Sequence, residues 1–387
     1  MGELYLHVVF LGTRGVPGRY SGFETFVEQL GSRMVERGHH VVVFNRTSQS
    51  YREPSYKGMV LVRTPAIYLK SLETLTAALW SSVVVVSRLP RPDLCIMCNV
   101  ATAPVAWIPK VFGIPVILNV DGLEWKRKKW GRVARLYFKF CERLALRSAS
   151  LIVTDAHVVR DYYLDKYGRE TRLVTYGVDS HDSIPEPGDK EVLRRYDLTP
   201  RGYILYVGRL VPENNAEFVA REFTNASGPA PRLKLAIVGD SSYTSAYRSS
   251  VEQWAGPNVL LLGGVYGDAY WVLQRNAAAY VQSTEVGGTH PALLEAMVVG
   301  SHILANDVPE HREVLKDCGD YYRSSSEFRG AIQQLQSGRF DSKGAMARAR
   351  VLTHYTWDAV LDAYADAGLA LIAARRNARV ALSVVKK

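Results

Sequence analysis

The sequence holds few cysteines and no long apolar run. Four cysteines among 387 residues are too few for the disulfide framework of a small secreted domain, which favours a reducing cytosol. Cys95 and Cys98 form a C-x-x-C pair inside an apolar strand pattern, and no second ligand pair follows at zinc spacing. The longest apolar run, residues 77–86, is interrupted by two serines and is shorter than the ~18 residues that span a bilayer. Since the first residues show no signal-peptide layout, we expect a cytoplasmic protein.

Acidic residues are also in short supply. The chain has 48 lysines and arginines against 38 aspartates and glutamates, a net charge of +10. A basic surplus attracts polyanions, either nucleic acid or an anionic membrane surface, and does not distinguish between them. The length suggests about two domains, and a hydrophobic fraction of 47% is ordinary for a globular protein.

Strand-like and helix-like segments alternate along the chain. Helical patterns occur, for example, at residues 23–37, 133–148 and 291–299. This alternation predicts parallel sheets covered by helices, and the prolines and acids of residues 179–190 are typical of a linker. We therefore expect an α/β protein with two Rossmann-like domains, 1–180 and 190–355, whose sheets face a central cleft. The predicted strands cover residues 5–11, 40–45, 59–63, 94–98, 115–119, 151–154, 173–176, 203–207, 234–238, 259–262, 277–282 and 302–305.

A strand, a Gly-Gly turn and a helix start follow one another in residues 277–297. Pro291 suits the first helical position, and the unpaired N–H groups of a helix N-terminus bind phosphate. Glu285 and Glu295 bracket the turn, and Glu295 lies where it could accept hydrogen bonds from sugar hydroxyls. The turn predicts a site for a nucleotide sugar, although a plain strand-to-helix connection has the same pattern.

The first strand-to-helix turn, residues 12–25, is longer than a dinucleotide-binding loop. Its glycines are spaced differently, and the second strand ends in Asn45 and Arg46 rather than in an acid. Arg46 could in principle bind the 2′-phosphate of NADP, so an NADP site is disfavoured but stays an alternative. The loop instead suits a donor or acceptor diphosphate, or is a mobile surface loop in which Arg14 and Arg19 are solvated.

Together with the motif Tyr-Val-Gly-Arg-Leu-Val-Pro-Glu-Asn-Asn at residues 206–215, three stretches carry a resemblance to a known family. They are residues 12–17 with 22–28, residues 119–127 and residues 285–289. The chain resembles the retaining glycosyltransferases of family 4, which have the GT-B fold. Within that family it is similar to a bacterial subgroup that includes rhamnosyltransferases of capsule and cell-wall polysaccharide assembly.

The resemblance implies roles for individual residues. Arg209 would hold the donor diphosphate, because the planar guanidinium binds phosphate bidentately. Glu295 would bind the ribose, and a segment around Tyr355 and Trp357 would lead residues 356–387 back to the first domain as a helical segment. The implied catalytic residues are Asp121, Arg209 and Glu285. The implied donor-binding residues are Gly15, Gly208, Arg209, Asn214, Gly287, Gly288, Thr289 and Glu295. The implied acceptor or loop residues are Arg14, Arg19, Gly22 and Glu24.

The sequence departs from the family pattern in the donor site. Many members carry a lysine where this chain has Asn214, and Gly287 stands where the usual Glu-x7-Glu spacing would place its first glutamate. One cation is thus missing from the leaving-group pocket, and Arg14 or Lys126 could compensate. No paired acids with metal-ligand spacing appear, so we expect a metal-independent enzyme without a cofactor, in which the acceptor hydroxyl attacks from the front face.

Residues 124–147 are predicted to form a basic helix. Five cations recur at spacings of 4, 3, 4 and 4 and share one helical face, while apolar residues such as Val133 and Phe140 are expected on the opposite face, packed against the protein. The basic face would bind an anionic membrane by electrostatics, at ~1 kcal/mol per cation; a solvated face is the alternative. The cations are Lys128, Arg132, Arg135, Lys139 and Arg143.

These inferences predict a retaining hexosyltransferase of bacterial surface polysaccharide biosynthesis. The expected donor is a nucleotide sugar, dTDP-rhamnose first, and the expected acceptor is a polyprenyl-diphosphate-linked saccharide at the inner face of the plasma membrane. A nucleotide-sugar epimerase on the same fold is one alternative and would need no acceptor. A nucleic-acid-binding protein, suggested by charge alone, is the other, although no nucleic-acid motif is present.

Overall fold

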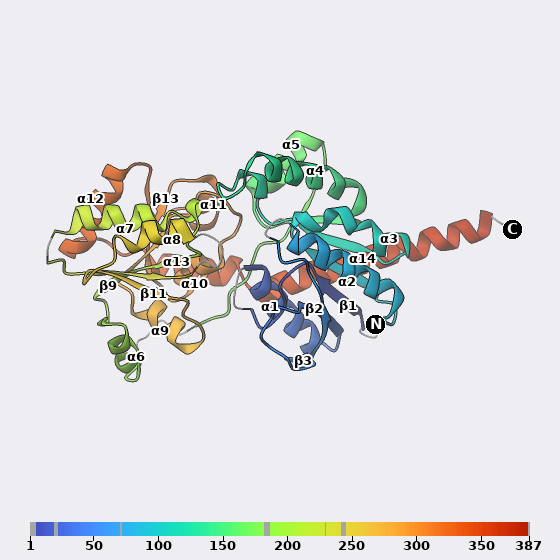
Figure 1. Cartoon of the computed structure of the whole chain (residues 1–387), viewed down its shortest axis with the longest axis horizontal. Helices are drawn as coiled ribbons and strands as arrows, with labels where there is room; N and C mark the ends of the chain where they lie inside the picture. The colour runs from blue at the N-terminus through green and yellow to red at the C-terminus, as the bar shows by residue number, and fades with distance from the viewer. Residues whose placement is uncertain are drawn as a thin grey trace. The chain divides into compact units, whose positions relative to one another are not determined.

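The computed structural model describes residues 5–18, 22–69, 72–181, 186–228, 230–240 and 245–385. The chain divides into two compact units (Figure 1). The first contains Met1–Lys126, Trp130–Tyr176 and Trp357–Lys387, and the second contains Arg127–Lys129 and Gly177–Thr356.

The first unit is built on an eight-stranded sheet in the order β3-β4-β2-β1-β5-β6-β7-β8. Neighbouring strands are parallel, except that β3 runs antiparallel to β4. Central strands of this kind are buried on both faces and need continuous apolar runs, which β1 and β5 provide. The strands are β1 His7–Leu11, β2 His40–Arg46, β3 Ser55–Tyr56, β4 Met59–Thr64, β5 Leu94–Cys98, β6 Val116–Asn119, β7 Leu151–Thr154 and β8 Arg172–Leu173.

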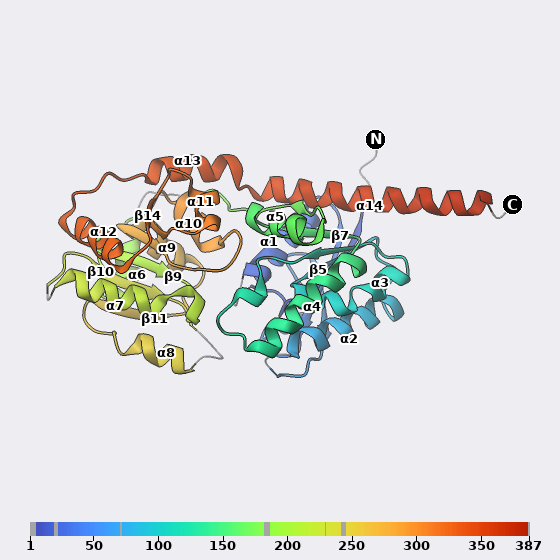
Figure 2. The same ribbon diagram turned by 90° about the horizontal axis from the view of Figure 1, so that it is seen from above.

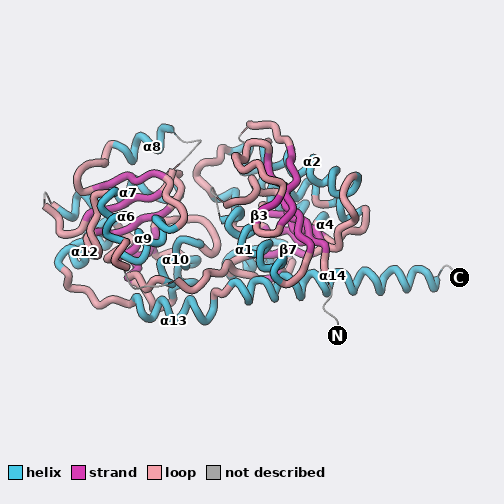
Figure 3. Tube along the Cα trace, turned by 90° about the horizontal axis from the view of Figure 1, so that it is seen from below, coloured by secondary structure: helices cyan, strands magenta, loops and turns pink. Residues whose placement is uncertain are grey.

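Helices cover both faces of this sheet. Figures 2 and 3 show α14 along one side of the strands and α2 and α4 along the other. On the α14 side, the ring of Phe26 in α1 lies 6.5 Å from that of Phe10 and 5.3 Å from that of Tyr364 in α14. The helices are α1 Gly22–Glu36, α2 Glu73–Ser87, η1 Val100–Val105, α3 Trp107–Val111, η2 Glu124–Lys126, α4 Arg132–Ser148, α5 His157–Tyr167 and α14 Trp357–Val385.

The second unit holds a six-stranded, fully parallel sheet in the order β11-β10-β9-β12-β13-β14. Its core joins residues of β9, α7 and β10, such as Ile204, Phe223 and Leu235. The strands are β9 Tyr203–Val207, β10 Lys234–Val238, β11 Val259–Gly263, β12 Ala279–Gln282, β13 His302–Asn306 and β14 Asp320–Tyr322. The helices are α6 Asp189–Arg195, η3 Pro212–Asn214, α7 Ala216–Ser227, α8 Ser245–Glu252, α9 Asp268–Asn276, α10 Pro291–Val298, α11 Pro309–Leu315, α12 Ser325–Ser337 and α13 Gly344–His354.

The predicted α/β class with two parallel-sheet domains is confirmed. Each predicted strand has a counterpart, but the short strands β3 and β14 were missed, and β8 ends at Leu173 rather than at Tyr176. Two- and three-residue strands at a sheet edge bury too little to leave an apolar run in the sequence.

The prediction of one basic helix over residues 124–147 is wrong in two respects. The helix α4 begins at Arg132, so Lys128 lies outside it and does not share its face. Val133 and Phe140 are not packed on the protein: 82% and 53% of their surfaces are exposed. The buried stripe instead contains Phe138, Cys141, Glu142, Ala145 and Ser148.

Candidate functional site

The carboxyl ends of β9 and β12, which are neighbours in the sheet, bring the two predicted donor motifs together. The amide nitrogen of Asn214 donates to the Arg209 carbonyl at 2.9 Å. From the β12 side, the Ser283 hydroxyl donates to the Asn214 carbonyl at 2.7 Å. The turn after β9 is thus held against the turn after β12, at the sheet edge where open α/β sheets bind ligands.

A side-chain network extends this contact to Glu285. The Asn215 amide, whose backbone is left-handed at φ 57°, donates to a Glu285 carboxylate oxygen at 3.0 Å. The Lys128 ammonium lies 2.6 Å from the other oxygen. The Glu285 N–H donates to the Glu213 carbonyl at 2.9 Å. Glu285 is therefore engaged by an amide and a cation, and Lys128 serves this edge of the second unit rather than a helix face.

Two arginines and two histidines lie near the Gly-Gly turn. The His290 ring is 5.3 Å from that of His311, and burial lowers the pKa of His290, as do His311, Arg127 and Arg209. Burial also lowers the pKa of His311, to about 4. Both imidazoles are therefore neutral at pH 7 and add no positive charge beside the two guanidinium groups.

Glycine is required at two positions of this edge. A Cβ on Gly287 would lie 2.3 Å from the His290 ring, and Gly239, at φ +148°, lies so close to Gly208 that a Cβ would be 1.9 Å from its carbonyl oxygen. Gly287, Gly288 and Thr289 are buried and lead into α10 with Pro291 at its first position. The turn therefore presents backbone rather than side chains before a helix N-terminus, as phosphate binding requires.

Glu295 lies one turn into α10. It accepts a short hydrogen bond from the Tyr270 hydroxyl. Burial raises the pKa of Glu295, and the Tyr270 hydrogen bond partly offsets that rise. Tyr270 was not predicted, because a tyrosine in α9, 25 residues away in sequence, leaves no local pattern.

In the first unit, the loop after β1 is fixed by Asn45 at the end of β2. The Val16 N–H donates to the Asn45 side-chain oxygen at 3.0 Å, and the Asn45 amide donates to the Val16 carbonyl at 2.6 Å. Gly15, at φ +108°, packs so tightly that a Cβ would lie 2.1 Å from Asn45. Residues 12–18 are therefore anchored, contrary to the mobile-loop alternative, whereas the predicted Arg19 lies outside the described residues.

The other loop residues have defined partners. The Arg14 N–H donates to the Glu24 carboxylate at 2.9 Å, and the Arg14 guanidinium lies 3.5 Å from Glu73. The buried Arg46 guanidinium lies 2.7 Å from Glu73. Arg46 is therefore neutralised by an acid that the sequence pattern did not reveal, and Gly22 is the first residue of α1.

Asp121 follows β6 in a left-handed conformation, at φ 57°. Its N–H donates to the Asn119 side chain at 3.0 Å. Burial raises the pKa of the Tyr176 hydroxyl, and Asp121 and Asp155 add to that rise. The predicted Asp121 thus shares the carboxyl edge of the first sheet with Asp155, an acid after β7 that sequence reasoning missed.

Among the described residues, no group of three or more His, Cys, Asp or Glu side chains is arranged to hold a metal ion. The four cysteines are buried and free, and burial raises the pKa of the Cys95 thiol to about 12. Within the described part of the chain, no helix is both long enough and apolar enough to cross a membrane.

Residues 201–337 match the family model described as glycosyl transferases group 1, and residues 5–179 match a domain of unknown function, DUF1972. A sucrose-phosphate synthase from Thermosynechococcus elongatus has a similar structure, with a TM-score of 0.77 at 18% identity over 95% of this chain and 100% of that one.

HepE from Anabaena, solved with UDP and glucose, gives a TM-score of 0.76 at 15% identity over 94% of this chain and 99% of that one. An α,α-trehalose-phosphate synthase from Burkholderia vietnamiensis gives 0.68 at 9% identity over 94% and 100%. No curated protein matches the sequence. The fold is that of the GT-B glycosyltransferases, with two parallel-sheet domains.

Proposed function

We propose that this chain, whose residues 201–337 form a group 1 glycosyltransferase domain, transfers a sugar from a nucleotide sugar to an acceptor hydroxyl with retention of configuration. The observation that carries the proposal is the edge of the second sheet, where Arg209 lies near His290, which follows the buried Gly287–Gly288 turn and precedes α10. Cations and unpaired N–H groups at such an edge stabilise the negative charge that develops on a departing diphosphate.

The donor would lie along this edge. Arg209 and the turn N–H groups bind the diphosphate, Glu295 accepts hydrogen bonds from the ribose, and Glu285 binds the sugar hydroxyls. The hydrogen bond from Tyr270 to Glu295 fixes the direction of that carboxylate before the donor arrives, which lowers the entropic cost of binding. The implied catalytic roles of Asp121 and Glu285 are part of this proposal.

The place of the missing lysine is filled, on this account, by Arg127. Asn214 is neutral, and its amide is used to hold the Arg209 carbonyl. Arg127 is buried and belongs to the second unit. Like Arg209, it lies close enough to His290 to lower the pKa of that imidazole. It therefore supplies the second cation that the departing diphosphate needs, a role for which the sequence suggested Arg14 or Lys126.

The proposed donor sugar is rhamnose, carried by dTDP, and the proposed acceptor is a saccharide on a polyprenyl diphosphate. The support is the motif resemblance of residues 12–28, 119–127 and 285–289. HepE, of similar fold, was solved with UDP-glucose, so UDP-glucose belongs in the same panel of donors.

The test is product analysis. The purified chain is incubated with dTDP-rhamnose or UDP-glucose and a short polyprenyl-diphosphate disaccharide. Mass spectrometry detects the added hexose, and NMR assigns the configuration of the new bond. A trisaccharide with the donor's anomeric configuration supports the proposal. Conversion of the donor sugar without transfer assigns an epimerase, and an inverted product contradicts the retaining route.

A further inference from the structure

Large apolar side chains are exposed on the outer surface of α2, α3 and α4. On α2, exposed residues recur with helical spacing and include Leu79, Trp80 and Val83. Large apolar side chains of monomeric proteins are scattered singly on the surface, and a contiguous patch marks an interaction site. The exposed large apolar residues of the three helices and of the residue after α3 are Leu79, Trp80, Val83, Trp107, Val111, Phe112, Val133, Leu136 and Phe140.

These residues form one surface because the three helices pack side by side. The helix α3 contacts both α2 and α4, and the Lys110 ammonium in α3 donates to the carbonyls of Arg147 and Ala149 at 2.8 and 3.0 Å. Figures 2 and 3 show α2 and α4 on the side of the sheet away from α14. The most exposed members are Val133, at 82%, and Val111, at 71%.

The charge of this surface has one sign. The three helices contain two acids, Glu73 and Glu142, and both are buried. Glu73 is paired with Arg46, and Glu142 accepts hydrogen bonds from tyrosine hydroxyls of α5. The cations of α3 and α4 are Lys110, Arg132, Arg135, Lys139, Arg143 and Arg147.

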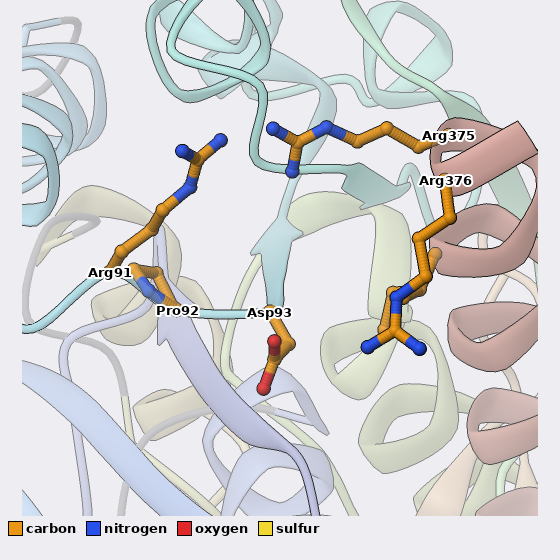
Figure 4. A pocket seen from close by; sticks show the side chains of 6 residues that line it. Arg91, Pro92, Asp93, Arg375 and Arg376 are labelled. Atoms are coloured by element: carbon orange, nitrogen blue, oxygen red, sulfur yellow. The ribbon is translucent and has the colours of Figure 1, made fainter. Parts of the chain in front are cut away.

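A pocket of about 230 Å³ lies beside the end of α3, where its lining residue Arg91 contacts the residue that follows the helix. It is lined by Arg91 and Asp93, which precede β5, and by Arg375 and Arg376 of α14, with two apolar residues (Figure 4). Arg91 donates to the carbonyls of Phe112 and Gly113 at 2.7 and 3.0 Å.

Three arginines and one aspartate give the pocket a formal charge of +2. One Asp93 oxygen already accepts the His7 N–H at 2.9 Å. Guanidinium groups around a small space are suited to a phosphate group.

We propose that this surface docks on an anionic phospholipid bilayer, with the apolar side chains in the membrane interface and the Arg91–Arg376 pocket on a lipid phosphate. Apolar side chains ringed by lysine and arginine are the composition of interfacial helices. A surface that binds nucleic acid needs cations for the phosphates but not this area of exposed apolar side chains, so a bilayer is the better match. Docking of this kind deepens the proposed function, because it places the enzyme beside a lipid-linked acceptor. Only the identity of that acceptor rests on the proposed function. Unlike the purely electrostatic contact expected from the sequence, it requires side chains to enter the bilayer.

The first experiment measures binding of the whole chain to phosphatidylcholine vesicles with and without phosphatidylglycerol, in the absence of donor and acceptor. Brominated lipids test for insertion, because they quench the fluorescence of tryptophans that reach the acyl chains. We expect binding, stronger on the anionic vesicles, and quenching that falls in Trp80→Phe and Trp107→Phe. No binding, or binding without quenching, overturns the proposal.

Variants separate the parts of the surface. The triple variant Val111→Ser, Phe112→Ser, Leu136→Ser should lower partitioning onto both kinds of vesicle by about tenfold or more, whereas the matched control Tyr266→Ser, Met346→Ser, at exposed positions of the second unit, should bind like wild type. Arg376→Gln should weaken binding about fivefold on anionic vesicles, and less on phosphatidylcholine, whose phosphate is offset by the choline cation.

Wild-type binding by the triple variant overturns the docking surface. An unchanged Arg376→Gln, or displacement by inorganic phosphate alone, overturns the lipid-phosphate pocket. If the chain transfers sugar to a water-soluble acceptor but does not bind vesicles, the docking proposal is refuted and the proposed function is not. Vesicle binding without any sugar transfer refutes the proposed function alone.

Discussion

The Arg127 guanidinium lies 4.0 Å from the Glu213 carboxylate, and both side chains are buried. Within the described residues, neither Glu213 carboxylate oxygen accepts a hydrogen bond. The charge of such a buried carboxylate is stabilised mainly by the neighbouring cation, because an isolated charge is costly to remove from water. Glu213 thereby positions Arg127 at the edge of the second sheet.

Removing one member of this pair should therefore destabilise the second unit. We predict that Arg127→Met lowers the free energy of unfolding by ~3 kcal/mol, since it leaves Glu213 buried and unpaired. The double variant Arg127→Met, Glu213→Leu should recover most of that loss. Urea unfolding of the four members of the cycle measures the coupling, and additive effects would show that the two side chains do not interact.

A second prediction separates the structural role of Arg127 from its proposed role at the diphosphate. In Arg127→Met, Glu213→Leu, nucleoside diphosphate affinity should fall about tenfold or more, the equivalent of one charged hydrogen bond. Adding Asn214→Lys, which restores the cation that many family members carry, should recover part of it. Calorimetric titration with dTDP and UDP checks this, with Lys126→Ala as the control. Undiminished affinity in the double variant would remove Arg127 from the donor site.

Much of this arrangement could be read from the sequence. The turns after β9 and β12 were predicted because strand, glycine and helix signals lie within a few residues of one another. Glu213 and Tyr270 were missed because their importance depends on contacts with distant segments.

The sides of α4 were assigned wrongly for a related reason. Apolar residues occur both on the buried stripe and on the exposed surface, as Phe138 and Phe140 illustrate, so a sequence pattern alone cannot tell which of them faces the core.

The histidines of the second unit predict loss of stability on mild acidification. Burial lowers the pKa of His311 to about 4, against ~6.5 in an unfolded chain. Below pH ~6.5 the unfolded state binds a proton that the folded state does not, so the free energy of unfolding falls as pH drops toward 4. For His311 alone this loss is on the order of 3 kcal/mol at most. Urea titrations at a series of pH values should show it.

His311→Gln is the matched variant for this prediction. It removes the titrating group, so its stability should depend less steeply on pH between about 6.5 and 4. An equal slope in wild type and variant would assign the acid sensitivity to other groups, such as His290, whose pKa is also lowered.

Transfer should not require a divalent metal. The described residues contain no cluster of ligands for one, and the proposed stabilisation of the leaving group relies on arginine and backbone N–H groups. We predict the same initial rate in excess EDTA as in magnesium. Loss of activity in the chelator that manganese or magnesium restores would contradict the metal-independent route.

The most direct test of the account is donor use by wild type and Arg209→Ala. Purified protein is titrated with a panel of nucleotide sugars, including dTDP-rhamnose and UDP-glucose, and release of the nucleoside diphosphate is followed with the saccharide acceptor present. We predict binding and turnover of one donor by wild type. We also predict a loss of about tenfold or more in Arg209→Ala, which removes a charged hydrogen bond to the diphosphate, with unchanged thermal unfolding. Failure of wild type to bind or turn over any nucleotide sugar, or full turnover by Arg209→Ala, would contradict the account.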